Sequence, residues 1–157
     1  MLGRDYEGQQ CSIARALEVV GERWTLLVLR DVMLGHHRFD ELVGTLGVTR
    51  TVLSDRLRTL VDHGLLAREP YREHPPRFAY HLTDKGRDLL PVLAHLMWWG
   101  DRHYPEPSGP PRLLQHRDCG GLVDPSFSCL TCGARLEDGQ IVHTPGPGAP
   151  AVADART

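Results

Sequence analysis

Four residues near the end of the chain have the types and spacing of a metal site. They follow the pattern His116-x2-Cys119-x9-Cys129-x2-Cys132, and a glycine comes directly after each close pair. Thiolate and imidazole groups in two close pairs suit a tetrahedral structural zinc ion, because each pair can hold the ion from one tight turn. The pattern therefore predicts a structural zinc site with these four residues as its metal ligands.

The same residues allow other interpretations. The cysteines could be reduced packing residues or form a disulfide, and either Asp118 or His143 could replace His116 as the fourth ligand. Three of the four cysteines of the chain fall in this stretch, which favours a metal over scattered core thiols. Because the ligand set is closed and no general base stands beside it, we expect a structural site and no metal catalysis.

Length and composition are those of one ordinary domain with an appendage. The chain has 157 residues, of which 41% are hydrophobic, and no apolar run approaches the roughly 18 residues of a membrane span. Residues 1–10 lack the charged and then apolar pattern of a signal peptide, and thiols spaced as metal ligands suit the reducing cytoplasm. We therefore expect a cytoplasmic protein that does not enter the membrane.

The charge of the chain is unevenly distributed. The net charge of −2 is not typical of a nucleic-acid binder, but between Arg50 and Arg77 six arginines stand against four acidic residues, a local balance of +2. No Ser-His-Asp order, phosphate-binding loop or pair of carboxylates indicates catalysis. The sequence therefore predicts a binding protein and not an enzyme.

Apolar periodicity predicts four helices in the first part of the chain. Their ranges are 12–20, 24–34, 39–47 and 49–63. The second helix is apolar nearly all round, which is typical of a helix at the centre of a core. Thr49 has the residue type of an N-terminal cap for the fourth helix. The last two helices, joined by a brief turn, form a helix-turn-helix pattern.

A β-hairpin and a long helix follow these four helices. Two short strands at 65–70 and 78–82 flank a rigid, charged tip at 71–77. Thr83 then caps a long helix that Pro91 should kink. This order of elements is that of a winged helix, in which the second helix of the helix-turn-helix enters the DNA major groove. The hairpin tip then reaches the adjacent minor groove or the phosphate backbone.

Polar side chains on the 49–63 helix and on the hairpin are the candidate DNA contacts. On the helix they are the positions that the apolar stripe leaves outward, and those near its N-terminus are best placed to reach base edges. A solvated charged face is the alternative for the helix taken alone, but the arginine-bearing hairpin favours DNA contact. The candidate residues are Thr49, Arg50, Thr51, Ser54, Asp55, Arg56, Arg58, Arg72, His74 and Arg77.

Several short pieces of the sequence, taken in order, resemble one family. They are Cys11-Ser-Ile-Ala, Val20-Gly-Glu-Arg-Trp-Thr-Leu-Leu, Arg38-Phe-Asp-Glu-Leu, Leu53-Ser-Asp-Arg-Leu-Arg-Thr-Leu, Gly64-Leu-Leu and Pro75-Pro-Arg-Phe-Ala-Tyr-His-Leu-Thr-Asp-Lys-Gly. With these pieces, residues 11–104 resemble the HxlR-type winged-helix transcriptional regulators, relatives of the MarR group. The resemblance implies a homodimer built from the first helix and the long helix. It also implies binding to an inverted-repeat operator on double-stranded DNA and control of nearby genes.

The expected fold class is mainly α, of the α+β type. It consists of a winged helix-turn-helix with a long C-terminal dimerisation helix and a small zinc-ribbon-like module. Members of the family commonly end soon after the long helix, so the metal-like segment is an addition whose role the resemblance does not supply. The expected division is 1–104 for the DNA-binding and dimerisation domain, 105–112 for a Pro-rich linker, 113–142 for the zinc module and 143–157 for a disordered tail.

Cys11 directly precedes a helix start, where backbone amides can make a thiol reactive. Some members of the family sense oxidants or electrophiles through a cysteine near this place, so the resemblance implies a redox switch. A packing residue is the plain alternative. The sequence thus predicts a DNA-binding transcriptional regulator with a small-molecule or oxidant effector. The alternative is a protein-interaction adaptor that acts through its zinc module, with DNA contact secondary.

Overall fold

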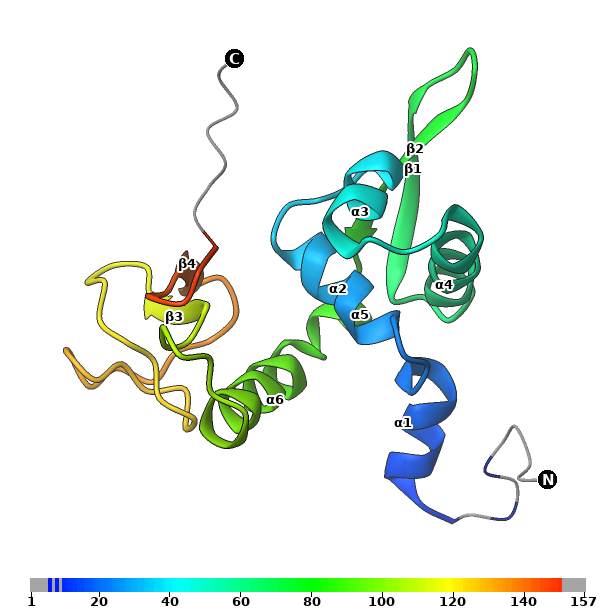
Figure 1. Cartoon of the computed structure of the whole chain (residues 1–157). Coiled ribbons are helices and arrows are strands. Elements are labelled where there is room, and N and C mark those ends of the chain that lie inside the picture. The colour runs from blue at the N-terminus through cyan, green and yellow to red at the C-terminus, as the bar shows by residue number, and fades with distance from the viewer. Residues whose placement is uncertain (1–5, 7, 9, 151–157) are drawn as a thin grey trace. The chain divides into compact units, whose positions relative to one another are not determined.

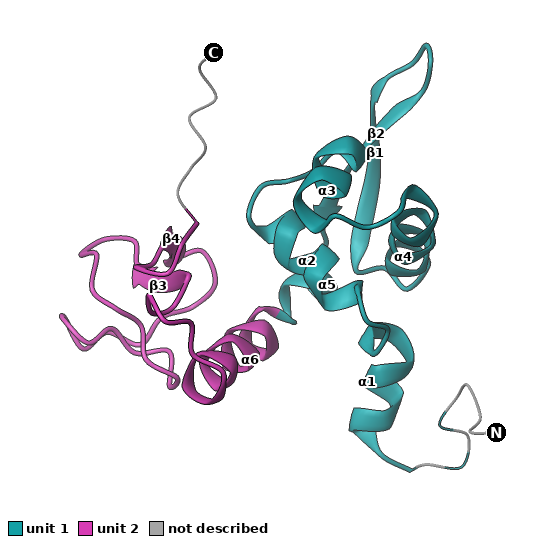
Figure 2. Ribbon diagram, in the orientation of Figure 1, with its two compact units in different colours: residues 1–89 teal, residues 90–157 magenta. Residues whose placement is uncertain are grey.

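A computed structural model describes residues 6, 8 and 10–150 of the chain, which divides into two units between Leu89 and Leu90 (Figure 2). Unit 1 is residues 1–89 and unit 2 is residues 90–157. The fold is mixed, with helices and antiparallel hairpins. In chain order the elements are α1 (Ser12–Val20), α2 (Thr25–Met33), α3 (Phe39–Leu46), α4 (Arg50–Asp62), β1 (Leu66–Arg72), β2 (Arg77–Leu82), α5 (Asp84–Arg87), α6 (Leu90–His103), β3 (Arg112–His116) and β4 (Ile141–Pro145) (Figure 1).

Helix α2 is the centre of the unit 1 core. Its side chains Val28, Leu29 and Val32 are at most 2% exposed, and the helix contacts α3, α4 and β2. A helix that is apolar on nearly all sides is stable only when neighbours cover it on several sides. The central position that the sequence predicts for this helix is therefore confirmed.

A buried carboxylate joins α2 to α3. The Asp31 side chain accepts hydrogen bonds from the Thr45 hydroxyl at 2.6 Å and from Arg30 Nε at 2.8 Å. Asp31 is only 2% exposed, and a carboxylate so far from water is tolerated only with partners of this kind. Because Thr45 belongs to α3, the contact fixes the first helix of the helix-turn-helix against the core.

Replacing Thr45 by valine is expected to destabilise unit 1 by about 1–3 kcal/mol, because the buried Asp31 carboxylate loses a hydrogen-bond donor. Urea unfolding followed by circular dichroism measures this change in the free energy of unfolding. Thr51→Val is the matched control, since Thr51 is exposed on α4. Equal losses in the two variants would contradict the role of the Asp31 contact.

Helix α4 begins after the predicted cap. The Thr49 hydroxyl accepts a hydrogen bond from the Val52 amide at 3.4 Å. Leu53, Leu57 and Leu60 are at most 1% exposed and pack inward. Their spacing of three and four residues places them along one side of the helix, so the other side is left outward. Together α3 and α4 form the predicted helix-turn-helix.

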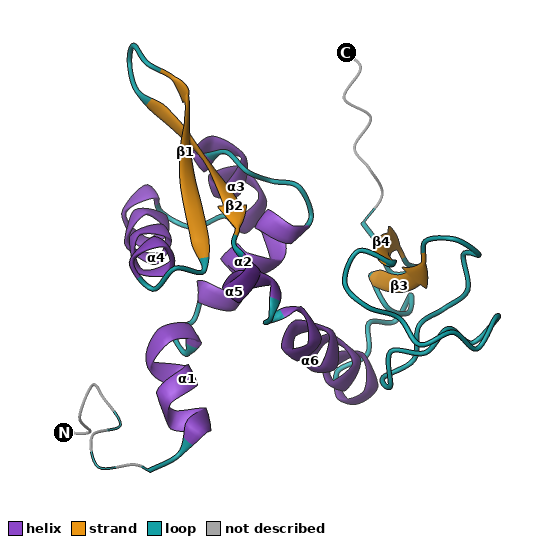
Figure 3. Cartoon of the chain, turned by 180° about the vertical axis from the view of Figure 1, so that it is seen from behind, coloured by secondary structure: helices purple, strands orange, loops and turns teal. Residues whose placement is uncertain are grey.

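Strands β1 and β2 form an antiparallel hairpin that projects beyond the helices of unit 1 (Figures 1 and 3). The paired register reaches Arg72 opposite Arg77. The base of the hairpin is tied to the turn between α2 and α3. There the Tyr80 amide donates to the His37 carbonyl at 2.8 Å, and the His37 ring Nδ1 donates to the Tyr80 carbonyl at 3.0 Å. The hairpin is therefore the wing that the sequence predicts, held at its base by the helix-turn-helix.

The long helix predicted after Thr83 is two helices in the structure. Thr83 does cap a helix, since its hydroxyl accepts from the Gly86 amide at 3.1 Å, but α5 ends at Arg87 and α6 begins at Leu90. Pro91 has no amide hydrogen to donate to the Arg87 carbonyl, as a continuous helix would require. In the first turn of a helix that hydrogen is not needed, so Pro91 starts a new helix instead of kinking one.

Unit 2 combines α6 with the cysteine-rich segment and is larger than the predicted zinc module. Strand β3 pairs antiparallel with β4, from Arg112 opposite Pro145 to His116 opposite Ile141. The sequence assigned α6 to the DNA-binding domain and everything from residue 143 to a disordered tail. Residues 143–145 instead belong to β4, because their backbone pairs with β3. The last part of the predicted tail, 151–157, lies outside the described residues.

Candidate DNA-binding face and metal cluster

The outward side of α4 carries the polar residues that the sequence predicts as DNA contacts. Five of the predicted contact residues of α4 are exposed: the N-cap, three residues in the first two turns and one residue further along the helix. The helix buries its leucines on the opposite side, so these side chains share one face that is free to meet a ligand. They are Thr49, Arg50, Thr51, Ser54 and Arg58.

Asp40 of α3 joins the predicted contacts of α4 to those of the wing. One of its carboxylate oxygens lies 2.8 Å from Arg50 on α4, and the other lies 3.9 Å from Arg77 on the wing. Arg50 also stacks on the Phe39 ring, with its guanidinium carbon 4.8 Å from the ring centre. The other wing candidates, Arg72 and His74, are exposed along the same hairpin. Sequence reasoning missed Asp40, because its role depends on α3, α4 and the wing meeting in space.

Replacing Asp40 by asparagine is expected to tighten binding to random duplex DNA by about fivefold at about 0.15 M salt, as one more cationic side chain becomes available to phosphate. Fluorescence anisotropy of a labelled duplex measures the change. Asp84→Asn is the control, since Asp84 pairs only with Arg87 of its own helix in the described ion pairs. Equal affinities of parent and Asp40→Asn would show that Asp40 does not restrain the two arginines.

Arg56 differs from the other predicted DNA contacts. Its side chain is 22% exposed and lies 3.3 Å from Glu22, in the turn between α1 and α2. Arg58 is more open, with its side chain 68% exposed and paired with Asp55 at 2.7 Å. The structure therefore brings Arg58 to the outward face of α4, whereas Arg56 faces the neighbouring turn.

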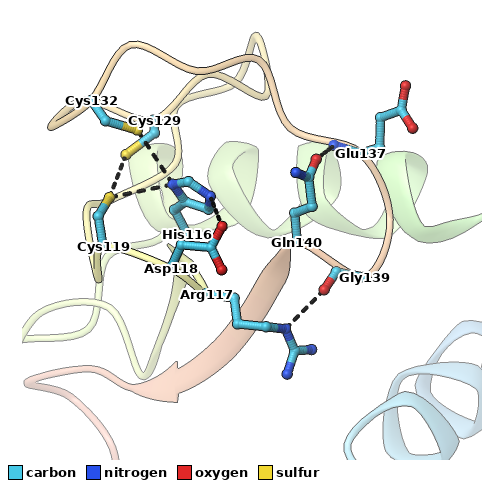
Figure 4. A network of polar contacts seen from close by, with 9 residues as sticks. All are labelled: His116, Arg117, Asp118, Cys119, Cys129, Cys132, Glu137, Gly139 and Gln140. Atoms are coloured by element: carbon cyan, nitrogen blue, oxygen red, sulfur yellow. Dashed lines mark hydrogen bonds and ion pairs between the residues drawn. The ribbon is translucent and has the colours of Figure 1, made fainter.

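The four residues of the predicted metal site converge in unit 2 (Figure 4). Their ligand atoms all lie within 4.8 Å of one another. The Cys119 sulfur is 3.3 Å from His116 Nδ1 and 3.4 Å from the Cys129 sulfur, and the Cys132 sulfur is 3.4 Å from His116 Nδ1. Three sulfurs and one imidazole nitrogen at these separations fit the donor set of a tetrahedral structural zinc ion.

The surroundings orient these ligands. His116 is 6% exposed, and its Nδ1 faces the sulfurs while its Nε2 lies 3.5 Å from the Asp118 carboxylate (Figure 4). A carboxylate at the outer nitrogen is the usual means of fixing a metal-binding histidine. The backbone N–H of Cys132 stabilises the Cys129 thiolate and lowers the pKa of Cys129 to about 6. With this pKa the Cys129 side chain is a thiolate at neutral pH, which is the form that binds a metal.

The two alternatives for the fourth ligand lie elsewhere. Asp118 is on the far side of the His116 ring from the sulfurs, and His143 is on β4 opposite Leu114. His143 is partly buried, and this desolvation lowers its pKa. His116 is therefore the imidazole that the structure brings to the three cysteines.

Cys11 is not among the residues of the metal cluster. It is partly exposed, takes an extended backbone conformation at the N-terminal cap of α1, and makes no side-chain capping hydrogen bond.

Among the described residues, no helix has the length and apolar character needed to cross a membrane.

A helix-turn-helix whose second helix leaves a polar face outward, followed by an arginine-bearing hairpin, defines a winged-helix protein. Residues 19–108 match the family model described as HxlR-like helix-turn-helix. An uncharacterized HTH-type transcriptional regulator of Mycobacterium tuberculosis is 47% identical over 147 residues, which are 94% of this chain and 92% of that protein. The chain therefore belongs to the HxlR-like helix-turn-helix family of transcriptional regulators.

Solved structures resemble the chain over two different lengths. The crystal structure of PA1607, described as a candidate transcription factor, is 35% identical with a TM-score of 0.68, and the match covers 83% of this chain and 92% of that one. The match covers more residues than the stretch 1–108 contains, so the similarity extends into unit 2 beyond residue 108. The redox regulator HypR in its oxidized form is 31% identical with a TM-score of 0.55, and the match covers 59% of this chain and 97% of that one.

Proposed function

We propose that the protein is a dimeric, sequence-specific regulator that binds an inverted-repeat operator through α4 and the wing. The observation that carries the proposal is the Asp40 link, which sets Arg50 of α4 and Arg77 of the wing beside each other on one face. This arrangement suits duplex DNA, because the helix can enter the major groove while the basic hairpin contacts the adjacent backbone. As an operator-binding protein it would act in the cytoplasm.

The candidate contacts divide by position. Arg50, Thr51 and Ser54 lie at the N-terminal end of α4, where they would reach base edges, and Asp55 would accept a hydrogen bond from cytosine. Arg58 and the wing residues would hold phosphates and set the register of the protein on the duplex. Base contacts then supply the sequence preference, and phosphate contacts supply most of the salt-dependent affinity.

Exposed apolar side chains support the homodimer. On α1, Ile13 is 70% exposed and Leu17 is 39% exposed. On α6, Val92, Leu96 and Trp99 are each about half exposed. Apolar side chains grouped on a helix in this way are typical of a surface that another protein covers. A second copy of the chain is the partner we propose for both helices.

Footprinting with hydroxyl radicals, together with the stoichiometry of the complex, tests the proposal. We expect two protected half-sites about one DNA turn, roughly 34–36 Å, apart, and two chains bound to each duplex. Protection of a single segment by one chain would contradict the dimeric arrangement.

We also propose that the cluster in unit 2 binds a structural zinc ion. His116, Cys119, Cys129 and Cys132 would hold it, and four protein ligands leave no position for a substrate. The ion would join the turn at 116–119 to the turn at 129–132 and so stabilise a module with little regular structure. We expect no catalytic role for the metal.

A redox response through Cys11 is a further part of the proposal. Its support is the place of this thiol at the amide end of α1 and the structural similarity to a redox regulator. Hydrogen peroxide is expected to weaken operator binding of the parent protein reversibly, with thiol restoring it, and to leave Cys11→Ser unchanged. An equal response of the two proteins would move sensing away from Cys11.

An adaptor function through the zinc module is the second candidate. Leu130 is 68% exposed in the turn between Cys129 and Cys132, and Leu122 is 43% exposed nearby in the chain. Exposed leucines on a small module could contact another protein. Deleting the chain after Pro110, compared with replacing Arg72 and Arg77, distinguishes the candidates. The adaptor is favoured if only the deletion abolishes the regulatory effect while DNA contact proves dispensable.

A further inference from the structure

Helix α6 packs one of its sides into the core of the part of unit 2 that follows it in the chain, here called the cysteine-rich module. Ala94 is 7% exposed and belongs to a cluster of buried residues with Leu114, Val123, Leu136 and Cys129. In the described part of the chain, the regular secondary structure of the module is limited to the two five-residue strands β3 and β4. The helix and the module therefore share one small core.

Aromatic contacts strengthen this packing. The Trp98 ring of α6 lies edge-on to the Phe127 ring of the module, with centroids 5.6 Å apart, and His95 lies 5.5 Å from each ring. Phe127 has a φ of 58°, which a side chain of this size rarely adopts. Such backbone strain persists only where the surrounding contacts hold it in place. The Phe127 backbone thus takes an unfavourable conformation in which its ring contacts α6.

Cys129 belongs both to this core and to the metal cluster. It is 2% exposed, and its sulfur lies 3.4 Å from that of Cys119. A Cβ atom on Gly121 would lie only 2.5 Å from the Cys129 sulfur, so the Gly121 backbone lies directly against the sulfur. A change at the metal cluster that moves Cys129 must therefore disturb the packing beneath α6.

The other side of α6 is apolar and exposed. Val92, Leu96 and Trp99 are 52%, 49% and 53% exposed, and their spacing of four and three residues places them in one stripe. A helix of 14 residues is only marginally stable in isolation. The stripe is thus an ordered surface only while the opposite side of the helix is packed.

We propose that metal binding at the His116, Cys119, Cys129 and Cys132 cluster sets the strength of the dimer through α6. The inference rests on the zinc site and the homodimer proposed above. Metal binding fixes Cys129 and stabilises the shared core, so that α6 presents its exposed stripe to the second copy. Without the metal the core loosens, the helix loses its packed side, and the dimer dissociates more readily.

Sedimentation equilibrium of the full chain, loaded with zinc or stripped by a chelator, tests the coupling. We expect stripping to raise the dimer dissociation constant by about tenfold or more, the range of ordinary coupling between two sites. Adding back stoichiometric zinc should restore it.

Two variants separate the coupling from its parts. Phe127→Ala keeps all four ligands and should still bind zinc, but its dimer should respond much less to the metal, because the contact with Trp98 is lost. Arg135→Ala, which removes an exposed side chain of the same module outside both the ligand turns and the contact with α6, should respond as the parent does.

Equal dissociation constants in a parent chain that does bind zinc would overturn the coupling alone. A chain that binds no zinc would overturn it together with the proposed metal site. A chain that is monomeric in both states would overturn it together with the proposed dimer.

Discussion

Replacing Arg72 and Arg77 together by alanine is expected to weaken binding to the operator and to random duplex DNA by the same factor. Both side chains are exposed on the wing, where we assign them to phosphate. A phosphate contact contributes about fivefold at about 0.15 M salt by counterion release, so two contacts amount to about 25-fold. The slope of log affinity against log salt should fall in magnitude by about 2. Anisotropy titrations at several salt concentrations measure both quantities.

The matched control for the wing variant is Arg87→Ala. Arg87 is an exposed arginine of α5 that pairs with Asp84 one turn away. Its removal should leave the salt slope unchanged. Loss of operator binding alone in the wing variant, with random binding intact, would mean that the wing reads bases and not phosphates.

Replacing Cys129 by serine is expected to lower the zinc content from about one ion per chain to near zero and to unfold the module. Structural zinc sites have apparent binding free energies of about 10–16 kcal/mol, which become folding free energy, so losing a thiolate ligand should be decisive for unit 2. Metal analysis gives the zinc content, and hydrogen exchange of residues 90–150 reports the folding of unit 2.

Cys11→Ser is the matched control, since it removes the one cysteine that lies outside the cluster. It should retain zinc and leave hydrogen exchange in unit 2 unchanged. A Cys129→Ser protein with full zinc content would show that Cys129 is not a ligand.

The parts of the fold that sequence reasoning predicted correctly depend on local patterns. The apolar character of 24–34 was enough to place α2 at the centre of the core. Thr49 was recognised as a cap because its hydroxyl acts on an amide only three residues away. The two pairs of metal-type ligands were found by their spacing, which already brings each pair together in one turn.

The parts that the sequence did not predict depend on contacts between distant segments. Residues 143–145 look like the start of a polar tail, and only pairing with β3 makes them a strand. Asp40 looks like an ordinary helix surface residue until α4 and the wing lie beside it. The sequence predicts only a kink at Pro91, whereas the structure ends α5 at Arg87 and begins α6 at Leu90.

The assignment of α6 changes how the two units relate to function. In the sequence it is the last helix of a DNA-binding domain, whereas in the structure Ala94 and Trp98 pack on the cysteine-rich module. The match with HypR covers 59% of the chain, and that with PA1607 covers 83%. Relatives of the longer kind are therefore the proteins in which a metal-dependent dimer should be sought.

Fluorescence anisotropy of the zinc-loaded protein measures directly whether it binds DNA with sequence preference. The two ligands are the intergenic DNA upstream of its own gene and a random duplex of the same length, at about 0.15 M salt. We expect the upstream DNA to be preferred by about a thousandfold or more. Equally weak binding to both duplexes would contradict a sequence-specific regulator of its own upstream region and would favour the adaptor function of the zinc module.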